Sequence, residues 1–123
     1  MADAIVSVYE DFAPGVKKIK WSWTSATGGT ASGATTNTYT GKVRRVVTDP
    51  DGTAAPTDDY DITITDDDGI DVLDGNGANR DTATNEVIAP SGIIVGSKLT
   101  LNVANAGAEK AGVVYVYVTD DMS

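Results

Sequence analysis

Short segments in which apolar and polar residues alternate recur along this chain, and they constrain its fold more than any other feature. The clearest is 18–24, where Ile19, Trp21 and Trp23 alternate with lysine, serine and threonine. Segments 5–9, 39–47, 60–65, 99–103 and 113–118 also have strand length and composition. A period of two places one set of side chains on a buried sheet face. No stretch of useful length repeats with the helical period of 3.6 residues, so the sequence predicts an all-β fold.

Turn signals separate these segments. Asp49-Pro50-Asp51-Gly52 and Asp66-Asp67-Asp68-Gly69 are typical β-turn sequences. The chain has 123 residues, which suits one domain around one core. We therefore expect residues 1–123 to form a single antiparallel β-sandwich or β-barrel of about six to eight short strands with long loops.

Three local features carry further expectations. Residues 1–15 are predicted to form an N-terminal strand or arm, and the Gly/Thr/Ser-rich segment 25–38 an exposed loop. Arg44-Arg45 interrupts the alternation of its strand, and a β-bulge there would restore the phase. Segment 113–118 is apolar on both faces, which fits a central strand covered on both sides or a strand whose outer face meets another protein.

The amino-acid composition limits the kinds of catalytic and metal-binding site that this chain can form. Histidine and cysteine are both absent, which removes the Ser-His and Cys-His nucleophilic systems and the common zinc sites. No pair of carboxylates stands out as a glycosidase pair. No run approaches the ~18 apolar residues of a membrane helix. The sequence thus predicts a protein that is not an enzyme, holds no cofactor and does not enter a membrane.

Calcium is the one metal hypothesis that the sequence raises. Asp66, Asp68, Asp71 and Asp74 lie close together in the chain, and carboxylates are suitable ligands for this ion. The spacing of an EF-hand loop fails, because Asp71 stands at the position where glycine is required. Solvated turns are therefore the favoured interpretation of this cluster, with a calcium site as the alternative.

Charge is unevenly distributed along the chain. The formal net charge is −9, yet residues 1–48 hold six basic and three acidic groups. Overall acidity disfavours nucleic acid as a partner. The basic residues concentrate on two predicted strands that can pair, and together with two tyrosines of the last strand they are candidates for a protein interface: Lys18, Lys20, Lys42, Arg44, Arg45, Tyr115 and Tyr117. Salt bridges to the abundant aspartates are the simpler interpretation of the basic residues. Trp21 and Trp23 are expected in the core, and a sugar-stacking platform would require them to be exposed.

Several segments together resemble a known family. They are Lys-Trp-Ser-Trp-Thr-Ser at 20–25, Gly41-Lys42-Val43, 47–57, Tyr60-Asp61-Ile62-Thr63, 69–73, 77–81 and Lys-Leu-Thr-Leu-Asn-Val at 98–103. Over most of residues 17–118 the chain is similar to small virion structural proteins encoded among the head genes of tailed bacteriophages.

The resemblance implies a non-enzymatic component of the phage particle, of the head decoration or cement type. Such a protein would be made in the cytoplasm of the host bacterium and would bind the major capsid protein on the outside of the head, as a dimer or trimer of itself. A neck, tail or head-fibre component is the alternative within the particle. A carbohydrate-binding β-sandwich module is the alternative outside it.

Overall fold

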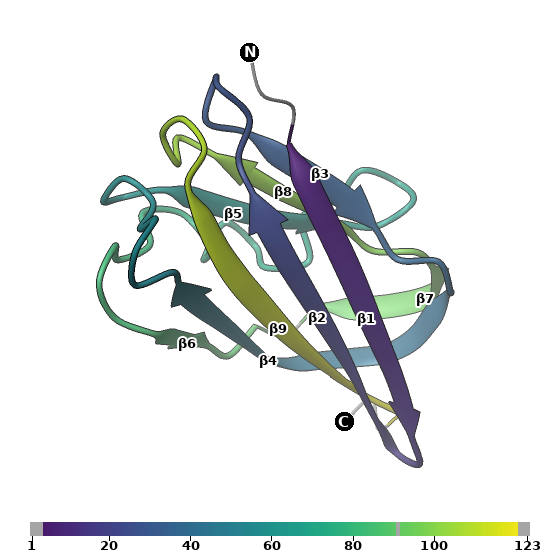
Figure 1. Ribbon diagram of the computed structural model, residues 1–123. Coiled ribbons are helices and arrows are strands. Elements are labelled where there is room, and N and C mark those ends of the chain that lie inside the picture. The colour runs from purple at the N-terminus through teal and green to yellow at the C-terminus, as the bar shows by residue number, and fades with distance from the viewer. Residues whose placement is uncertain (1–3, 91, 121–123) are drawn as a thin grey trace.

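The computed structural model describes residues 4–90 and 92–120, which form two packed antiparallel β-sheets (Figure 1). The strands are β1 (Ile5–Ala13), β2 (Val16–Thr24), β3 (Ala31–Ala34), β4 (Tyr39–Pro50), β5 (Asp61–Thr65), β6 (Glu86–Ile88), β7 (Ile93–Ser97), β8 (Thr100–Ala104) and β9 (Ala111–Thr119). The larger sheet has the order β1-β2-β9-β4, and β6 and β7 pair with different parts of β4. The smaller sheet has the order β3-β8-β5. The predicted all-β fold is confirmed as a sandwich, with nine strands in the described residues where about six to eight were expected.

The core lies between the two sheets, where the alternating residues meet. Trp21 and Trp23 of β2 are 0% and 2% exposed, so their predicted burial is confirmed. Tyr60 packs against Trp23 with ring centroids 5.8 Å apart. Ile62 and Ile64 of β5 are fully buried on the facing sheet. Each strand therefore places its apolar set toward the other sheet, as the period of two requires.

β9 is the central strand of the larger sheet, between β2 and β4. Its inward residues Val114, Val116 and Val118 are fully buried. Its outward residues Tyr115 and Tyr117 are only half-buried, and no second layer of the described chain covers them. The two-sided apolar character of 113–118 thus reflects a strand that is central within its sheet but open on one face.

The expected exposed loop at 25–38 is wrong in its middle, where Ala31–Ala34 forms β3 and pairs with β8. These small residues are needed because the strand lies close to β1 and β2. A Cβ atom on Gly33 would lie 2.6 Å from a methyl group of Val6, and the Trp21 indole donates a hydrogen bond to the Gly33 carbonyl at 3.0 Å. Small side chains thus allow close packing here.

The N-terminal segment, for which the sequence makes a prediction, and segment 70–73 complete the description. Within the predicted N-terminal strand or arm, Ile5–Ala13 forms β1, which is longer than the alternating segment 5–9, while residues 1–3 lie outside the described residues. Segment 70–73 is a turn in which Val72 and Leu73 are buried. In the part of the chain that the structure describes, no helix has the length and apolar character of a membrane span.

Candidate functional site: the outer face of the larger sheet

The outer face of the larger sheet turns away from the core and carries cations and tyrosines side by side. The pairing register determines which residues lie on this face, because paired residues of neighbouring strands lie on the same side of a sheet. Tyr9 of β1 pairs with Lys20 of β2, and Lys20 pairs with Tyr115 of β9. We call this surface the cationic–aromatic face, and it comprises Tyr9, Lys18, Lys20, Lys42, Arg44, Arg45, Val47, Val87, Tyr115 and Tyr117.

The two tyrosines of β9 are held between cations from both neighbouring strands. The Lys18 Nζ atom lies 4.9 Å from the ring centroid of Tyr115 and 5.7 Å from that of Tyr117. Lys20 Nζ lies 5.9 Å from the Tyr115 centroid, and the Arg45 guanidinium carbon lies 5.9 Å from the Tyr117 centroid. Such contacts are attractive, each contributing about 0.5–1 kcal/mol at exposed positions. They place the cationic groups of Lys18, Lys20 and Arg45 beside the tyrosine rings of β9.

A β-bulge in β4 places two consecutive arginines on this face. The register between β4 and β9 shifts between Val43 and Arg45, which confirms the predicted bulge. Arg45 pairs with Tyr117, and the extra residue Arg44 donates from Nε to the Thr119 hydroxyl at 3.0 Å. Because a bulge sets two residues against one, both guanidinium groups lie on the outer side of the sheet.

All seven interface candidates from the sequence therefore lie on one face. The expectation that their two strands can pair directly is wrong, because β9 lies between β2 and β4 and supplies the tyrosines. Sequence reasoning missed Tyr9, Val47 and Val87. Tyr9 alternates with Val6 and Val8, which pack on the core, and this phase is the signal that would have placed it outside.

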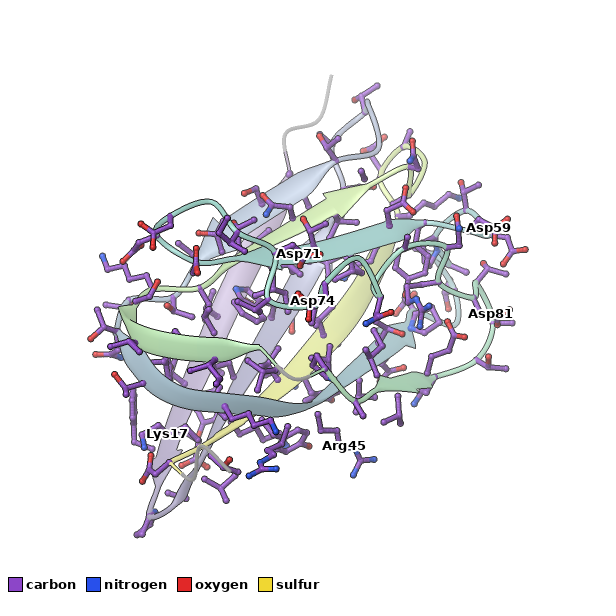
Figure 2. All side chains as sticks on the ribbon, turned by 180° about the vertical axis from the view of Figure 1, so that it is seen from behind. Lys17, Arg45, Asp59, Asp71, Asp74 and Asp81 are labelled. Carbon is purple, nitrogen blue, oxygen red and sulfur yellow. The ribbon has the colours of Figure 1, made fainter. Side chains whose placement is uncertain are left out.

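Charge is segregated between this face and the rest of the molecule. Five of the nine basic residues lie on it, and of the acidic residues in its strands, Asp11 and Asp49 lie on the same outer side. The loops hold most of the other acids. Figure 2 shows Arg45 projecting away from the two sheets, with Asp59, Asp71, Asp74 and Asp81 on the loops. A chain with net charge −9 thus presents one locally cationic surface.

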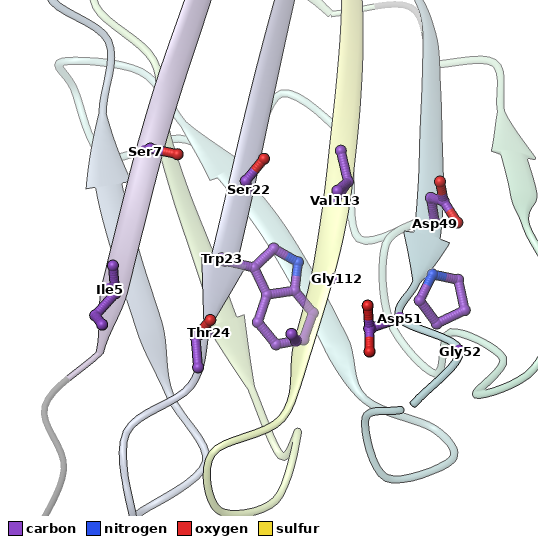
Figure 3. A pocket seen from close by; sticks show the side chains of 12 residues that line it. Ile5, Ser7, Ser22, Trp23, Thr24, Asp49, Asp51, Gly52, Gly112 and Val113 are labelled. Carbon is purple, nitrogen blue, oxygen red and sulfur yellow. The ribbon is translucent and has the colours of Figure 1, made fainter. Parts of the chain in front are cut away.

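Two shallow hollows lie on the outer side of the larger sheet, one at the end where Ile5 and Gly112 lie and one over the cationic–aromatic face. The first is lined by residues of all four long strands, and Figure 3 shows Ser7, Ser22, Val113 and Asp49 in one row across them. The second is lined mainly by Tyr9, Lys18, Lys20 and Tyr115. Both include Ser7 and Ser22, so they adjoin. Shallow hollows of this kind suit contact with another protein surface better than enclosure of a small molecule.

Glu10 fixes the strand that carries Tyr9. Its carboxylate accepts hydrogen bonds from the Tyr39 hydroxyl at 2.6 Å, from the backbone N–H groups of Thr36 and Asn37 at 3.0 and 3.1 Å, and from Asn37 Nδ2 at 3.3 Å. Burial alone would raise the pKa of Glu10, but these hydrogen bonds, led by that from Tyr39, outweigh burial and lower it. Burial and the Glu10 carboxylate together raise the pKa of Tyr39.

Two of the four calcium candidates, Asp66 and Asp71, accept hydrogen bonds from backbone N–H groups in turns. Asp66 Oδ1 accepts the backbone N–H groups of Asp68 and Ile70 at 2.9 and 3.0 Å. Asp71 accepts N–H groups from Ile64 and Leu73 through Oδ1 and from Gly75 through Oδ2. Asp74 is an exposed turn residue with a φ of 53°. Within residues 4–90 and 92–120, no three acidic side chains converge on a point where a metal ion could bind.

The buried tryptophans bear on the sugar-binding alternative. A stacking platform built on Trp21 or Trp23 needs an exposed indole ring. Both rings instead lie between the sheets, and Trp23 lies beneath Gly112 of β9 (Figure 3). No family model matches this chain, and no curated protein matches its sequence.

Proposed function

We propose that this protein is a non-enzymatic structural component of a tailed-phage particle, a head decoration or cement protein that attaches through its cationic–aromatic face. The partner surface would be an acidic patch on the lattice of the major capsid protein. The observation that carries this proposal is the cationic–aromatic face itself, an open surface that concentrates five cations on an acidic chain.

The chemistry of the face supports docking to a protein. Interfaces are enriched in tyrosine and arginine, and their central anchors are commonly aromatic rings flanked by polar groups. Tyr115 and Tyr117 have this arrangement, and Val47 and Val87 extend the apolar area toward β6. The complementary charge would also speed association and select an acidic partner.

The phage assignment rests on the sequence resemblance, and the fold is compatible with it. A particle component needs a stable fold with a surface available for binding, and a sandwich with one open sheet face meets this need. The protein would be made in the cytoplasm of the host bacterium and would reach the outer surface of the head during assembly. A neck, tail or head-fibre position would place the same fold on the particle in far fewer copies.

The proposal is tested with particles from a phage strain that lacks the gene for this chain. Purified protein is added to these particles, and binding is measured by co-sedimentation at increasing salt. We expect saturation at a copy number in proportion to the capsid lattice, with affinity that falls as salt rises. The double variant Lys20→Glu/Arg45→Glu should bind at least about tenfold more weakly.

A matched control carries the same change of charge elsewhere. Lys98 and Lys110 lie in connections outside the cationic–aromatic face, so Lys98→Glu/Lys110→Glu should bind like the unmodified protein. Equal weakening of both variants would mean that net charge, and not this face, governs attachment. Saturation at only a few copies per particle would replace the decoration assignment with a neck, tail or fibre position.

A further inference from the structure

β1 is a long sheet edge whose N-terminal half, Ile5 to Tyr9, lacks the usual protection. It pairs with β2 through nine consecutive positions and, among the described residues, with no other strand. The opposite edge of the larger sheet is divided between the short strands β6 and β7. Natural edge strands are commonly blocked by charged side chains, especially lysine, by proline or by a bulge. β1 has the sequence Ile-Val-Ser-Val-Tyr-Glu-Asp-Phe-Ala, with no lysine, proline or bulge, and its two charged side chains, Glu10 and Asp11, both follow Tyr9.

The hairpin between β1 and β2 determines which backbone groups of β1 point outward. Pro14 and Gly15 connect Ala13 to Val16, and Gly15 has a φ of 77°. In this tight turn the Val16 N–H donates to the Ala13 carbonyl, so Ala13 and Val16 are a hydrogen-bonded pair. Hydrogen-bonded positions then alternate along the strand. The N–H and C=O groups of Val6, Val8 and Glu10 are therefore the ones that face away from β2.

We propose that a second copy of this chain pairs its β1 antiparallel to this edge, with the two-fold axis at Ser7. In this register Val6 lies opposite Val8 of the second copy, and the outward backbone groups of the two residues satisfy each other. Ile5 lies opposite Tyr9 of the second copy on the outer face. Ile5 and Tyr9 are 69% and 62% exposed, so the pairing covers two apolar side chains that the single chain leaves in water.

The register follows from the positions of the acids on β1. An axis at Val8 would set Asp11 opposite Ile5 and Glu10 opposite Val6, placing carboxylates against apolar side chains. An axis at Ser7 pairs Ile5 with Tyr9, Val6 with Val8 and serine with itself, and it sets Glu10 opposite the small side chain of Ala4. The axis at Ser7 therefore keeps both carboxylates away from the larger apolar side chains, and this self-complementarity favours a second copy over an unrelated strand.

Pairing at β1 would also extend the cationic–aromatic face. Tyr9 belongs to both the edge and that face, so two copies would present one continuous outer surface. Two joined copies bind a repeating lattice more tightly than one copy. The pairing itself does not depend on the proposed attachment to a capsid, because it is a property of the isolated protein.

Single cysteines test the register, because the chain has none of its own. Across a two-fold at Ser7 the two Cα atoms at this non-hydrogen-bonded position lie about 4.5 Å apart, within the ~4.4–6.8 Å range of a disulfide. We expect Ser7→Cys to form a covalent dimer under mild oxidation. In Tyr9→Cys the two thiols would lie about 13 Å apart along the strands and should stay unlinked. Preferential linking of Tyr9→Cys, or linking of neither, would overturn the proposal.

Sedimentation equilibrium provides an independent test without oxidation. The unmodified protein should form dimers in a concentration-dependent manner. Ser7→Lys sets two ammonium groups together at the axis and should be monomeric, while Ser32→Lys, an exposed position on β3, should still form dimers. A monomeric unmodified protein at its highest soluble concentration would refute the pairing. The variant Lys20→Glu/Arg45→Glu should keep the Ser7→Cys linkage, so failure of docking and failure of pairing are distinguishable.

Discussion

Removal of the Glu10 carboxylate should loosen the attachment of β1 to the rest of the sandwich. Glu10 accepts four hydrogen bonds, three from Thr36 and Asn37 in the connection between β3 and β4 and one from Tyr39, the first residue of β4. Tyr39, one of the donors, is 2% exposed, and a buried hydroxyl without an acceptor costs about 1–3 kcal/mol. The backbone donors are exposed, so water replaces part of what they lose. We expect Glu10→Ala to lower the free energy of unfolding by about 2 kcal/mol.

Urea denaturation followed by tryptophan fluorescence measures this loss. Glu10→Gln keeps one acceptor oxygen without the charge and should cost about 1 kcal/mol. The double variant Glu10→Ala/Tyr39→Phe should be more stable than the sum of the single changes predicts, by about 1 kcal/mol, because the two groups share one hydrogen bond. Strictly additive effects, or a Glu10→Ala cost below about 0.5 kcal/mol, would refute the reasoning.

The lowered pKa of Glu10 predicts that the free energy of unfolding depends on pH. The folded-state pKa of Glu10 is lowered, so its contribution to stability is complete above the unfolded-state pKa of about 4.3. That contribution is lost as pH falls through the lower, folded-state value. Glu10→Gln has no carboxylate to protonate and should therefore show a shallower loss of stability with acid. Identical slopes in the two proteins would contradict the role assigned to Glu10.

Three further predictions follow, two from the packing of the tryptophans and one from the hydrogen bonds of Asp71. Gly112→Ala should destabilise by about 1–3 kcal/mol, because the new Cβ would lie 2.7 Å from the Trp23 ring; a shift of the urea midpoint measures this. Trp21→Phe should cost about 2–4 kcal/mol, since it leaves a cavity and removes the indole N–H that donates a hydrogen bond to the Gly33 carbonyl; thermal and urea unfolding measure the loss. Added calcium followed by EGTA should not move the melting temperature, because Asp71 already accepts backbone N–H groups through both oxygens.

The predictions for Gly112 and for calcium each have a comparison that isolates the cause. Gly52 has open space around its Cα atom, so Gly52→Ala should leave stability nearly unchanged. If Gly112→Ala were equally neutral, the close approach of β9 to Trp23 would be disproved. A melting temperature that rises with calcium and falls again with EGTA would establish a metal site in the aspartate-rich turns.

The sequence predicted the strands whose residues alternate and missed those that depend on distant partners. Ile19, Trp21 and Trp23 show the sheet period by themselves, and their burial was predictable. β3 consists of small residues without a pattern, and it exists because β8 pairs with it and β1 packs on Gly33. Segment 70–73 has the composition of a strand, but its burial comes from a turn folded against the core.

The candidate site was predictable in its residues and not in its arrangement. Lys18, Lys20 and Arg45 stood out as a basic group in an acidic chain. The order of strands in the sheet was needed to show that β9 lies between them and that Tyr115 and Tyr117 separate the cations. Tyr9 joins the face through the pairing of β1 with β2, a contact between strands that local alternation cannot specify.

Cryo-electron microscopy of the intact phage particle tests the proposed function most directly. The account predicts this chain at regular positions on the outside of the head, with Tyr115, Tyr117 and the surrounding cations against acidic residues of the capsid lattice. Density for the chain with the smaller sheet against the shell and the cationic–aromatic face in solvent would contradict the account. So would its absence from the particle.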